Sequence, residues 1–142
     1  VDIRAFCHPI KILSNLNYFK NYNNTLLLPY SCLSKNIRSY FDKNSILDYG
    51  IKIEKKISIN SNYIALKNPL ALIYAVGFLI SKNIKNIYFA GFDGYSADEP
   101  NQDASFEMIE SLKKKYSKKN INFASLTSSK LNIRKINLKQ IR

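Results

Sequence analysis

Short apolar runs alternate with polar turns along the chain, and their spacing predicts alternating strands and helices. A run of about four to eight apolar or β-branched residues bounded by turn residues is typical of a buried strand. The sequence predicts strands over residues 2–8, 25–28, 46–53 (interrupted at Gly50), 86–90 and 122–126, and one or two weaker strands within 57–66. Pro9 and Pro29 end the first two strands, because proline cannot donate to a sheet ladder.

Apolar residues that recur every three or four positions predict the helices. They are expected over 10–19, from Ser31 or Ser34 to about Phe41, over 69–82 and over 101–119. In the last of these, acidic side chains crowd the start and lysines the end, which agrees with the helix dipole.

The helix expected over 69–82 is apolar on almost every side between Leu70 and Ile80. Asn68 can cap its N-terminus, and Pro69 suits the first turn, where a missing N–H costs nothing. A membrane span takes about 20 apolar residues, so this shorter run is expected to be buried against one face of a sheet.

Strands that alternate with helices predict an α/β protein with a largely parallel sheet, and we expect at least four mainly parallel strands. We expect a three-layer, Rossmann-like arrangement with helices on both faces, and residues 1–142 as a single domain. The glycine fingerprints of dinucleotide-binding and P-loop proteins are absent from the sequence.

The net charge of +12, from 22 basic and 10 acidic residues, would ordinarily suggest a nucleic-acid partner. Most of the cations are lysines, and the chain is rich in Lys, Asn and Ile, as AT-rich genomes encode. The lysines at the end of the helix over 101–119 also have a structural explanation in its dipole. The sequence therefore favours no nucleic-acid partner, although the charge would still attract a phosphate-bearing substrate.

The Cys and His content bounds the metal and redox chemistry. Cys7, Cys32 and a lone His8 show no metal-ligand spacing, so neither a metal nor a cofactor is expected in this chain. A disulfide stays open, but free thiols are favoured. The N-terminus shows no signal-peptide layout, so we expect a cytoplasmic protein without a membrane span.

Ligands of parallel sheets bind outside the carboxyl ends of the strands, an edge called the rim below. Loops 7–9, 29–31, 91–95 and 127–129 are expected to meet there. The candidate ligand-binding residues are Asn68, Gly91, Asp93, Gly94, Tyr95 and Ser128. His8 is a candidate general base or phosphate contact. Plainer alternatives stay open: turn chemistry for the Gly-Asp-Gly loop, a backbone hydrogen bond for His8 and a simple cap for Asn68.

The apolar helix and strand that end in Gly91-Phe92-Asp93-Gly94-Tyr95, followed by Asp98-Glu99-Pro100, carry a resemblance to a known family. Residues 64–112 resemble the Rossmann-like domain fused behind 4-hydroxy-2-oxovalerate-type aldolases in bacterial surface-glycan gene clusters. They are more distantly similar to bacterial sialyltransferases and to flagellin glycosyltransferases (motility accessory factors).

The resemblance implies that the domain binds a nucleotide sugar or a sugar phosphate. In the sialyltransferases the tyrosine of this loop contacts the leaving phosphate, so Tyr95 is expected to do the same. Residues 6–9 look like the family's Asn-Pro segment at the nucleotide pocket, and Asn68 is similar to the start of the helix that holds the nucleotide.

Two departures limit the implied activity. The chain lacks the Gly-Asn-Gly-Pro-Ser loop of the sialyltransferases and the lid that carries their catalytic histidine. We therefore expect a C-terminal fragment of a longer enzyme, lacking the family's first strand and loop and inactive alone, with an upstream TIM-barrel aldolase domain as its partner. The leading interpretation is an accessory or partial catalytic domain of surface-carbohydrate biosynthesis, belonging to an aldolase (a lyase). The alternatives are a glycosyltransferase-like catalytic domain and a non-catalytic assembly domain.

Overall fold

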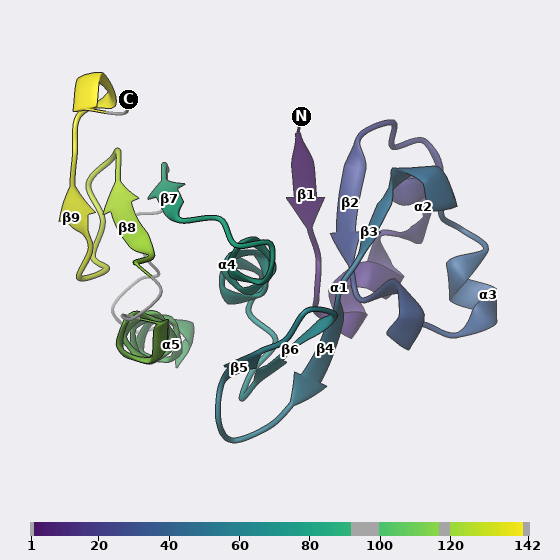
Figure 1. The fold of residues 1–142 in the computed structure, drawn as a ribbon. Coiled ribbons are helices and arrows are strands. Elements are labelled where there is room, and N and C mark those ends of the chain that lie inside the picture. The colour runs from purple at the N-terminus through teal and green to yellow at the C-terminus, as the bar shows by residue number, and fades with distance from the viewer. Residues whose placement is uncertain (1, 92–99, 117–119, 141–142) are drawn as a thin grey trace. The chain divides into compact units, whose positions relative to one another are not determined.

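The computed structural model describes residues 2–91, 100–116 and 120–140, with side chains for all of these except 100–103. The chain is an α/β protein that divides into an N-terminal unit, residues 1–81, and a C-terminal unit, residues 82–142 (Figure 1). Within the described residues, no helix is long and apolar enough to cross a membrane.

The N-terminal unit contains short strands connected by short helices. Its strands are β1 (Ile3–Ala5), β2 (Thr25–Leu28), β3 (Ile46–Asp48), β4 (Gly50–Ile53), β5 (Ser58–Ile59) and β6 (Tyr63–Leu66). Its helices are α1 (Pro9–Ser14), α2 (Leu16–Lys20), η1 (Tyr30–Cys32), α3 (Lys35–Arg38), η2 (Lys43–Ser45) and α4 (Ala71–Ser81). The parallel ladder β1-β2-β3 forms one sheet; β4-β6-β5 forms another, with β4 parallel and β5 antiparallel to β6.

The two sheets of this unit meet at Tyr49. The amide of Tyr49 donates to the Leu28 carbonyl over 3.0 Å, and the amide of Gly50 donates to the Asn62 carbonyl over 2.7 Å. Successive amides of an extended chain point in opposite directions, so β2 and β6 flank residues 46–53 on opposite sides. The predicted interruption at Gly50 is thus the point where one extended segment passes from the first sheet into the second.

Gly50 is required there by close packing. A Cβ at this position would lie 3.0 Å from Tyr63 Cβ and 3.3 Å from the Asn62 carbonyl oxygen. Any side chain would push β4 away from β6, and the pairing of the second sheet would be disturbed at its first residue.

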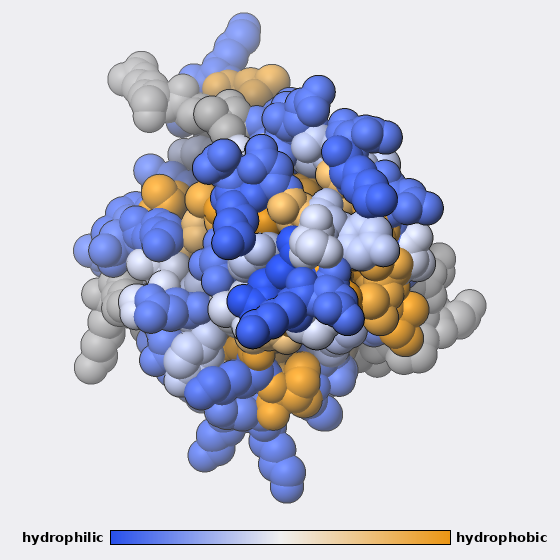
Figure 2. Space-filling view, turned by 90° about the vertical axis from the view of Figure 1, so that its right-hand side faces the viewer, coloured by the Kyte–Doolittle hydropathy of each residue, from blue (hydrophilic) through white to orange (hydrophobic). Residues whose placement is uncertain are grey.

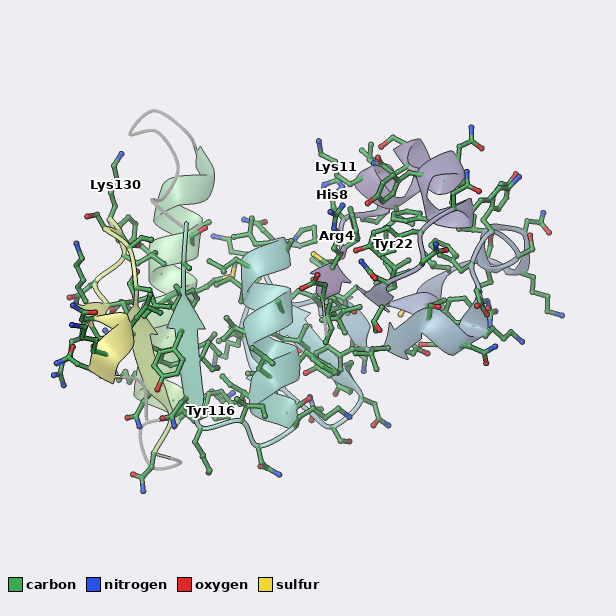
Figure 3. The ribbon with its side chains drawn as sticks, turned by 90° about the horizontal axis from the view of Figure 1, so that it is seen from above. Arg4, His8, Lys11, Tyr22, Tyr116 and Lys130 are labelled. Carbon is green, nitrogen blue, oxygen red and sulfur yellow. The ribbon has the colours of Figure 1, made fainter. Side chains whose placement is uncertain are left out.

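One face of the first sheet packs against α1 and α2. Alternate residues of β2 point to opposite faces, and its two even-numbered leucines enter a shared apolar cluster. The buried members of that cluster are Ile12, Phe19, Leu26, Leu28 and Phe41. Figure 3 shows α1 and α2 on one side of β1 and α4 on the other, so helices flank this sheet on both sides.

The helix predicted over 10–19 is two helices, α1 and α2, with a break at Asn15. The Asn15 side-chain amide donates to the Lys11 carbonyl over 2.7 Å, and its backbone dihedrals (φ −115°, ψ 16°) are not helical. Asparagine competes in this way for backbone groups that a continuous helix would use.

The predicted apolar helix is α4, and its burial is confirmed. It contacts β1, β5 and β6, and most of its side chains are buried. It begins at Ala71, where the Leu70 carbonyl accepts the Tyr74 amide over 2.9 Å. The prediction that Asn68 caps this helix is therefore wrong, because the Asn68 carbonyl instead accepts the Leu70 amide (2.9 Å) in a turn that precedes the helix.

The C-terminal unit is a parallel sheet with one long helix. Its elements are β7 (Asn86–Phe89), α5 (Pro100–Tyr116), β8 (Asn122–Ser125), β9 (Arg134–Lys135) and η4 (Leu138–Gln140). Tyr88 of β7 pairs with Ala124 of β8, which pairs with Arg134 of β9. The strands predicted over 86–90 and 122–126 are confirmed, whereas β9 was not predicted: it has only two residues, both charged.

Candidate functional site

The ends of β7 and β8 bring two of the predicted loops together. The Gly91 amide donates to Thr127 Oγ1 over 3.0 Å, and the Leu126 amide donates to the Phe89 carbonyl over 2.8 Å. Gly91 has φ +67°, a conformation that suits glycine because it has no Cβ. The first residue of the Gly91 loop and the segment 127–129 therefore share the rim of this sheet.

Hydroxyl groups fix the turn that follows β8. Ser125 is almost completely buried, and its hydroxyl donates to the Thr127 carbonyl over 2.8 Å. Ser129 Oγ accepts the Leu131 amide over 3.1 Å. The hydroxyl groups of Ser125 and Ser129 thus stabilise the turn. Between these two residues, only the Ser128 side chain is exposed.

Lys135 brings a positive charge to this rim. Its Nζ donates to Ser128 Oγ over 3.2 Å, so the ammonium lies beside a predicted ligand-binding residue. Lys135 was not among the residues predicted from the sequence, because the two charged residues of β9 have no apolar periodicity. No predicted strand ends at Lys135, so the sequence alone held no signal that would place it at the rim.

A hollow of about 450 Å³ adjoins the rim of the C-terminal unit. Its lining residues come from the end of β8 and from β9 to η4: Leu126, Lys135, Ile136, Asn137, Leu138 and Gln140. Its volume is that of a small-molecule site, and its lining combines apolar side chains with one cation and two amides. An ammonium and amide donors can hold an anionic or hydroxyl-rich ligand.

The remaining residues of the predicted loop, Asp93, Gly94 and Tyr95, lie outside the residues that the structure describes. Their assignment to ligand binding stays a prediction from the sequence.

Two further candidates lie in the N-terminal unit. His8 is exposed and directly precedes α1; its carbonyl accepts the Ile12 amide over 3.0 Å, and its imidazole makes no capping hydrogen bond (Figure 3). Asn68 is exposed after β6. The candidates thus fall into two groups, His8 and Asn68 in one unit and Gly91 and Ser128 in the other.

The polar groups of the loop after β2 form hydrogen bonds within the protein. The amide and the hydroxyl of Ser31 both donate to Asp48 Oδ1, over 3.0 and 3.2 Å. This carboxylate braces the turn into η1, which is the ordinary use of aspartate beside a turn.

The two cysteines differ in environment. Both thiols are free; Cys32 is exposed, whereas Cys7 is only 1% exposed. Burial raises the pKa of the Cys7 thiol to about 12, so it stays protonated and unreactive at neutral pH. Burial also raises the pKa of the Tyr74 phenol. Among the described residues, no group of three or more His, Cys, Asp and Glu side chains could hold a metal ion.

Comparisons with known protein families, with curated proteins and with solved structures found no match for this chain.

Proposed function

We propose that this chain is a domain that binds a nucleotide sugar or a sugar phosphate at the rim of the C-terminal unit. The observation that carries the proposal is the position of Lys135, whose Nζ contacts Ser128 Oγ where the ends of β7 and β8 meet. Parallel sheets bind ligands at this edge, and an ammonium there compensates the charge of a phosphate.

The groups at the rim would have different roles. The Gly91 amide is engaged by Thr127, so it fixes the loop and is not a donor to the ligand. Lys135 and the Ser128 hydroxyl would bind the phosphate, and the amides of Asn137 and Gln140 in the adjoining hollow suit sugar hydroxyls.

The Tyr95 phenol would donate to the phosphate without adding charge, as the family resemblance implies. A carboxylate facing a phosphate would repel it, so Asp93 would accept from sugar hydroxyls or brace the loop.

We also propose a fold type for the domain and the kind of enzyme to which it belongs. Parallel strands, together with helices on both sides of the first sheet, support a three-layer, Rossmann-like domain. The resemblance of residues 64–112 suggests an accessory or partial catalytic domain of an aldolase-type enzyme of bacterial surface-carbohydrate biosynthesis.

A ligand-observed titration tests the binding. Wild-type protein is titrated with nucleotide sugars and with sugar phosphates, and the result is compared with Lys135→Gln, Tyr95→Phe and Asp93→Ala variants. Lys139→Gln is the matched control, because this exposed lysine of η4 does not line the hollow. We expect Tyr95→Phe to weaken binding by about 0.5–1.5 kcal/mol, the usual net value of one hydrogen bond.

The two roles of Asp93 are separated by stability. Asp93→Ala lowers the melting temperature if the carboxylate braces the loop, and leaves it unchanged if the carboxylate only contacts the ligand. Absence of binding by both ligand classes, or equal losses in Lys135→Gln and Lys139→Gln, would refute the proposal.

A further inference from the structure

We propose that a second site, a basic pocket beside α3 in the N-terminal unit, binds the phosphate group of a small molecule. The pocket has a volume of about 410 Å³ and is lined by Tyr30, Lys35, Arg38, Ser39, Phe41 and Lys43. Three of these side chains are cations and none is an acid. The inference is independent of the rim of the C-terminal unit.

The three cations lack carboxylate partners. Within the part of the chain that the structure describes, Lys35, Arg38 and Lys43 make no ion pair. The sequence neighbour Asp42 does not line the pocket, and its Oδ1 accepts the Asn44 amide over 3.0 Å. Like charges held around one hollow repel one another, and a bound anion relieves that repulsion.

Arg38 provides a second, separate observation. Its Nε is buried and has no hydrogen-bond partner, although a buried donor is nearly always paired. A guanidinium matches the geometry of a phosphate, because its N–H groups donate to two oxygens at once. Arg38 lines the pocket and is only half-buried, so its terminal N–H groups are the donors that a bound phosphate would contact.

Aromatic packing holds Arg38 in place. Its guanidinium carbon lies 5.7 Å from the centre of the Tyr30 ring, and Tyr30 packs edge-to-face on Phe41 with ring centres 6.3 Å apart. Phe41 belongs to the core of the unit. The arginine is therefore positioned before a ligand arrives, which lowers the entropy cost of binding.

The remaining lining groups fit a phosphorylated organic molecule. The Ser39 hydroxyl donates to the Asn36 carbonyl over 2.7 Å, which fixes its orientation and leaves its oxygen lone pairs facing away from that bond. Figure 2 shows the side of the molecule on which α3 lies, where strongly hydrophilic side chains surround apolar patches. Charge at the margin and aromatic side chains beneath suit a phosphate attached to an organic group.

The test is a binding titration of the whole chain with inorganic phosphate, pyrophosphate and a nucleoside diphosphate, followed by amide chemical shifts. We expect pyrophosphate and the nucleoside diphosphate to shift the amides of residues 30–43. Arg38→Gln should weaken pyrophosphate binding roughly tenfold to a hundredfold, as loss of a charge-assisted hydrogen bond implies.

A pair of double variants keeps the test independent of folding. Lys35→Gln with Lys43→Gln removes two exposed charges from the pocket, and Lys55→Gln with Lys56→Gln removes two exposed charges from the loop after β4. Only the first pair should weaken pyrophosphate binding. The affinity is taken from the amide shifts of residues 30–43 alone, so binding at the rim of the C-terminal unit does not contribute to it.

Three results would overturn the inference. The first is no shift at millimolar pyrophosphate, and the second is equal weakening by the two lysine pairs, which would indicate a diffuse effect of net charge. The third is tighter binding of a short single-stranded RNA than of pyrophosphate at the same salt concentration, which would assign the pocket to a nucleic acid. Binding of inorganic phosphate as tight as that of the nucleoside diphosphate would identify free phosphate as the ligand.

Discussion

The backbone amide of Gly91 donates a hydrogen bond to the side-chain oxygen of Thr127, 3.0 Å away and 36 residues along the chain. One residue follows β7 and the other follows β8, so the bond connects the ends of two parallel strands. Because Gly91 has φ +67°, the bond also fixes the direction in which the chain leaves β7. The position and direction of the first residue of the candidate ligand loop are therefore fixed by this bond.

Replacing Thr127 tests whether this bond holds the rim together. Thr127→Val keeps the shape of the side chain but removes the acceptor, so we expect a loss of about 0.5–1.5 kcal/mol in the free energy of unfolding. Thr127→Ser keeps the oxygen and should lose less. Urea unfolding measures both variants. Equal stability of Thr127→Val and the wild-type protein would show that the bond contributes nothing.

We expect glycine to be required at position 91 because of its positive φ, and not because a side chain would clash there. A Cβ at this position would meet no atom within 4 Å, yet φ +67° costs an L-residue about 1–2 kcal/mol. Gly91→Ala should therefore lower the unfolding free energy by about that amount. Gly91→Asn should lower it less, because asparagine tolerates this conformation. If alanine were as stable as glycine, the positive φ would not be a constraint.

The elements that the sequence predicted best are those whose apolar residues are buried on both sides. The strand expected over 25–28 is β2, and the run expected over 69–82 contains α4. A continuous apolar run has one stable location, the interior, so pattern and structure agree. The start of α4 was misplaced because the turn at Asn68 is formed by backbone bonds that apolar patterning does not report.

The parts of the candidate sites that the sequence did not predict depend on contacts between distant segments. Lys135 reaches the rim through the pairing of β9 with β8, and a two-residue charged strand leaves no periodic pattern. Arg38 was part of an expected helix, and its position over Tyr30 arises from the packing of Phe41. A local sequence pattern cannot identify such residues, because their role depends on the tertiary structure.

The thiols should differ in their rate of alkylation. At pH 8 we expect iodoacetamide to modify the exposed Cys32 readily and to leave Cys7 intact, because burial both shields that thiol and raises its pKa to about 12. Mass spectrometry should show one added group in native protein and two in urea. A Cys32→Ser variant should add none while folded. Two rapid additions to native protein would contradict the burial of Cys7.

Cys7 also predicts how stability depends on alkaline pH. Its pKa rises from 9.0 to about 12 on folding, so folding favours the protonated thiol. The resulting stabilisation is fully present below pH 9 and is lost as pH rises towards 12. We expect the urea midpoint to fall over this range, and to fall less steeply in Cys7→Ala. The two proteins differ only at residue 7, so parallel pH profiles would exclude Cys7 as the cause.

The closest contact between α4 and the sheet predicts a compensating pair of substitutions. A Cβ added at Gly77 would lie 2.3 Å from Ile64 Cδ1, which is too close for both groups to remain. Ile64 is completely buried, so its side chain has little room to move. Overpacking costs about 1–3 kcal/mol, whereas alanine in a helix gains about 0.5–1 kcal/mol over glycine. Gly77→Ala alone should therefore be destabilising.

The second substitution removes the atom responsible. Ile64→Val deletes Cδ1 and by itself costs about 0.5–1.5 kcal/mol. The nearest remaining atom, Cγ1, lies 3.3 Å from the new Cβ, a tight contact that a small shift of the valine side chain relieves. In the Ile64→Val background, Gly77→Ala should become neutral or stabilising, so the two changes couple by about 1–3 kcal/mol. Urea unfolding of the four proteins in the cycle measures that coupling. If the two losses simply add, α4 does not lie against β6 at the distance that the structure gives.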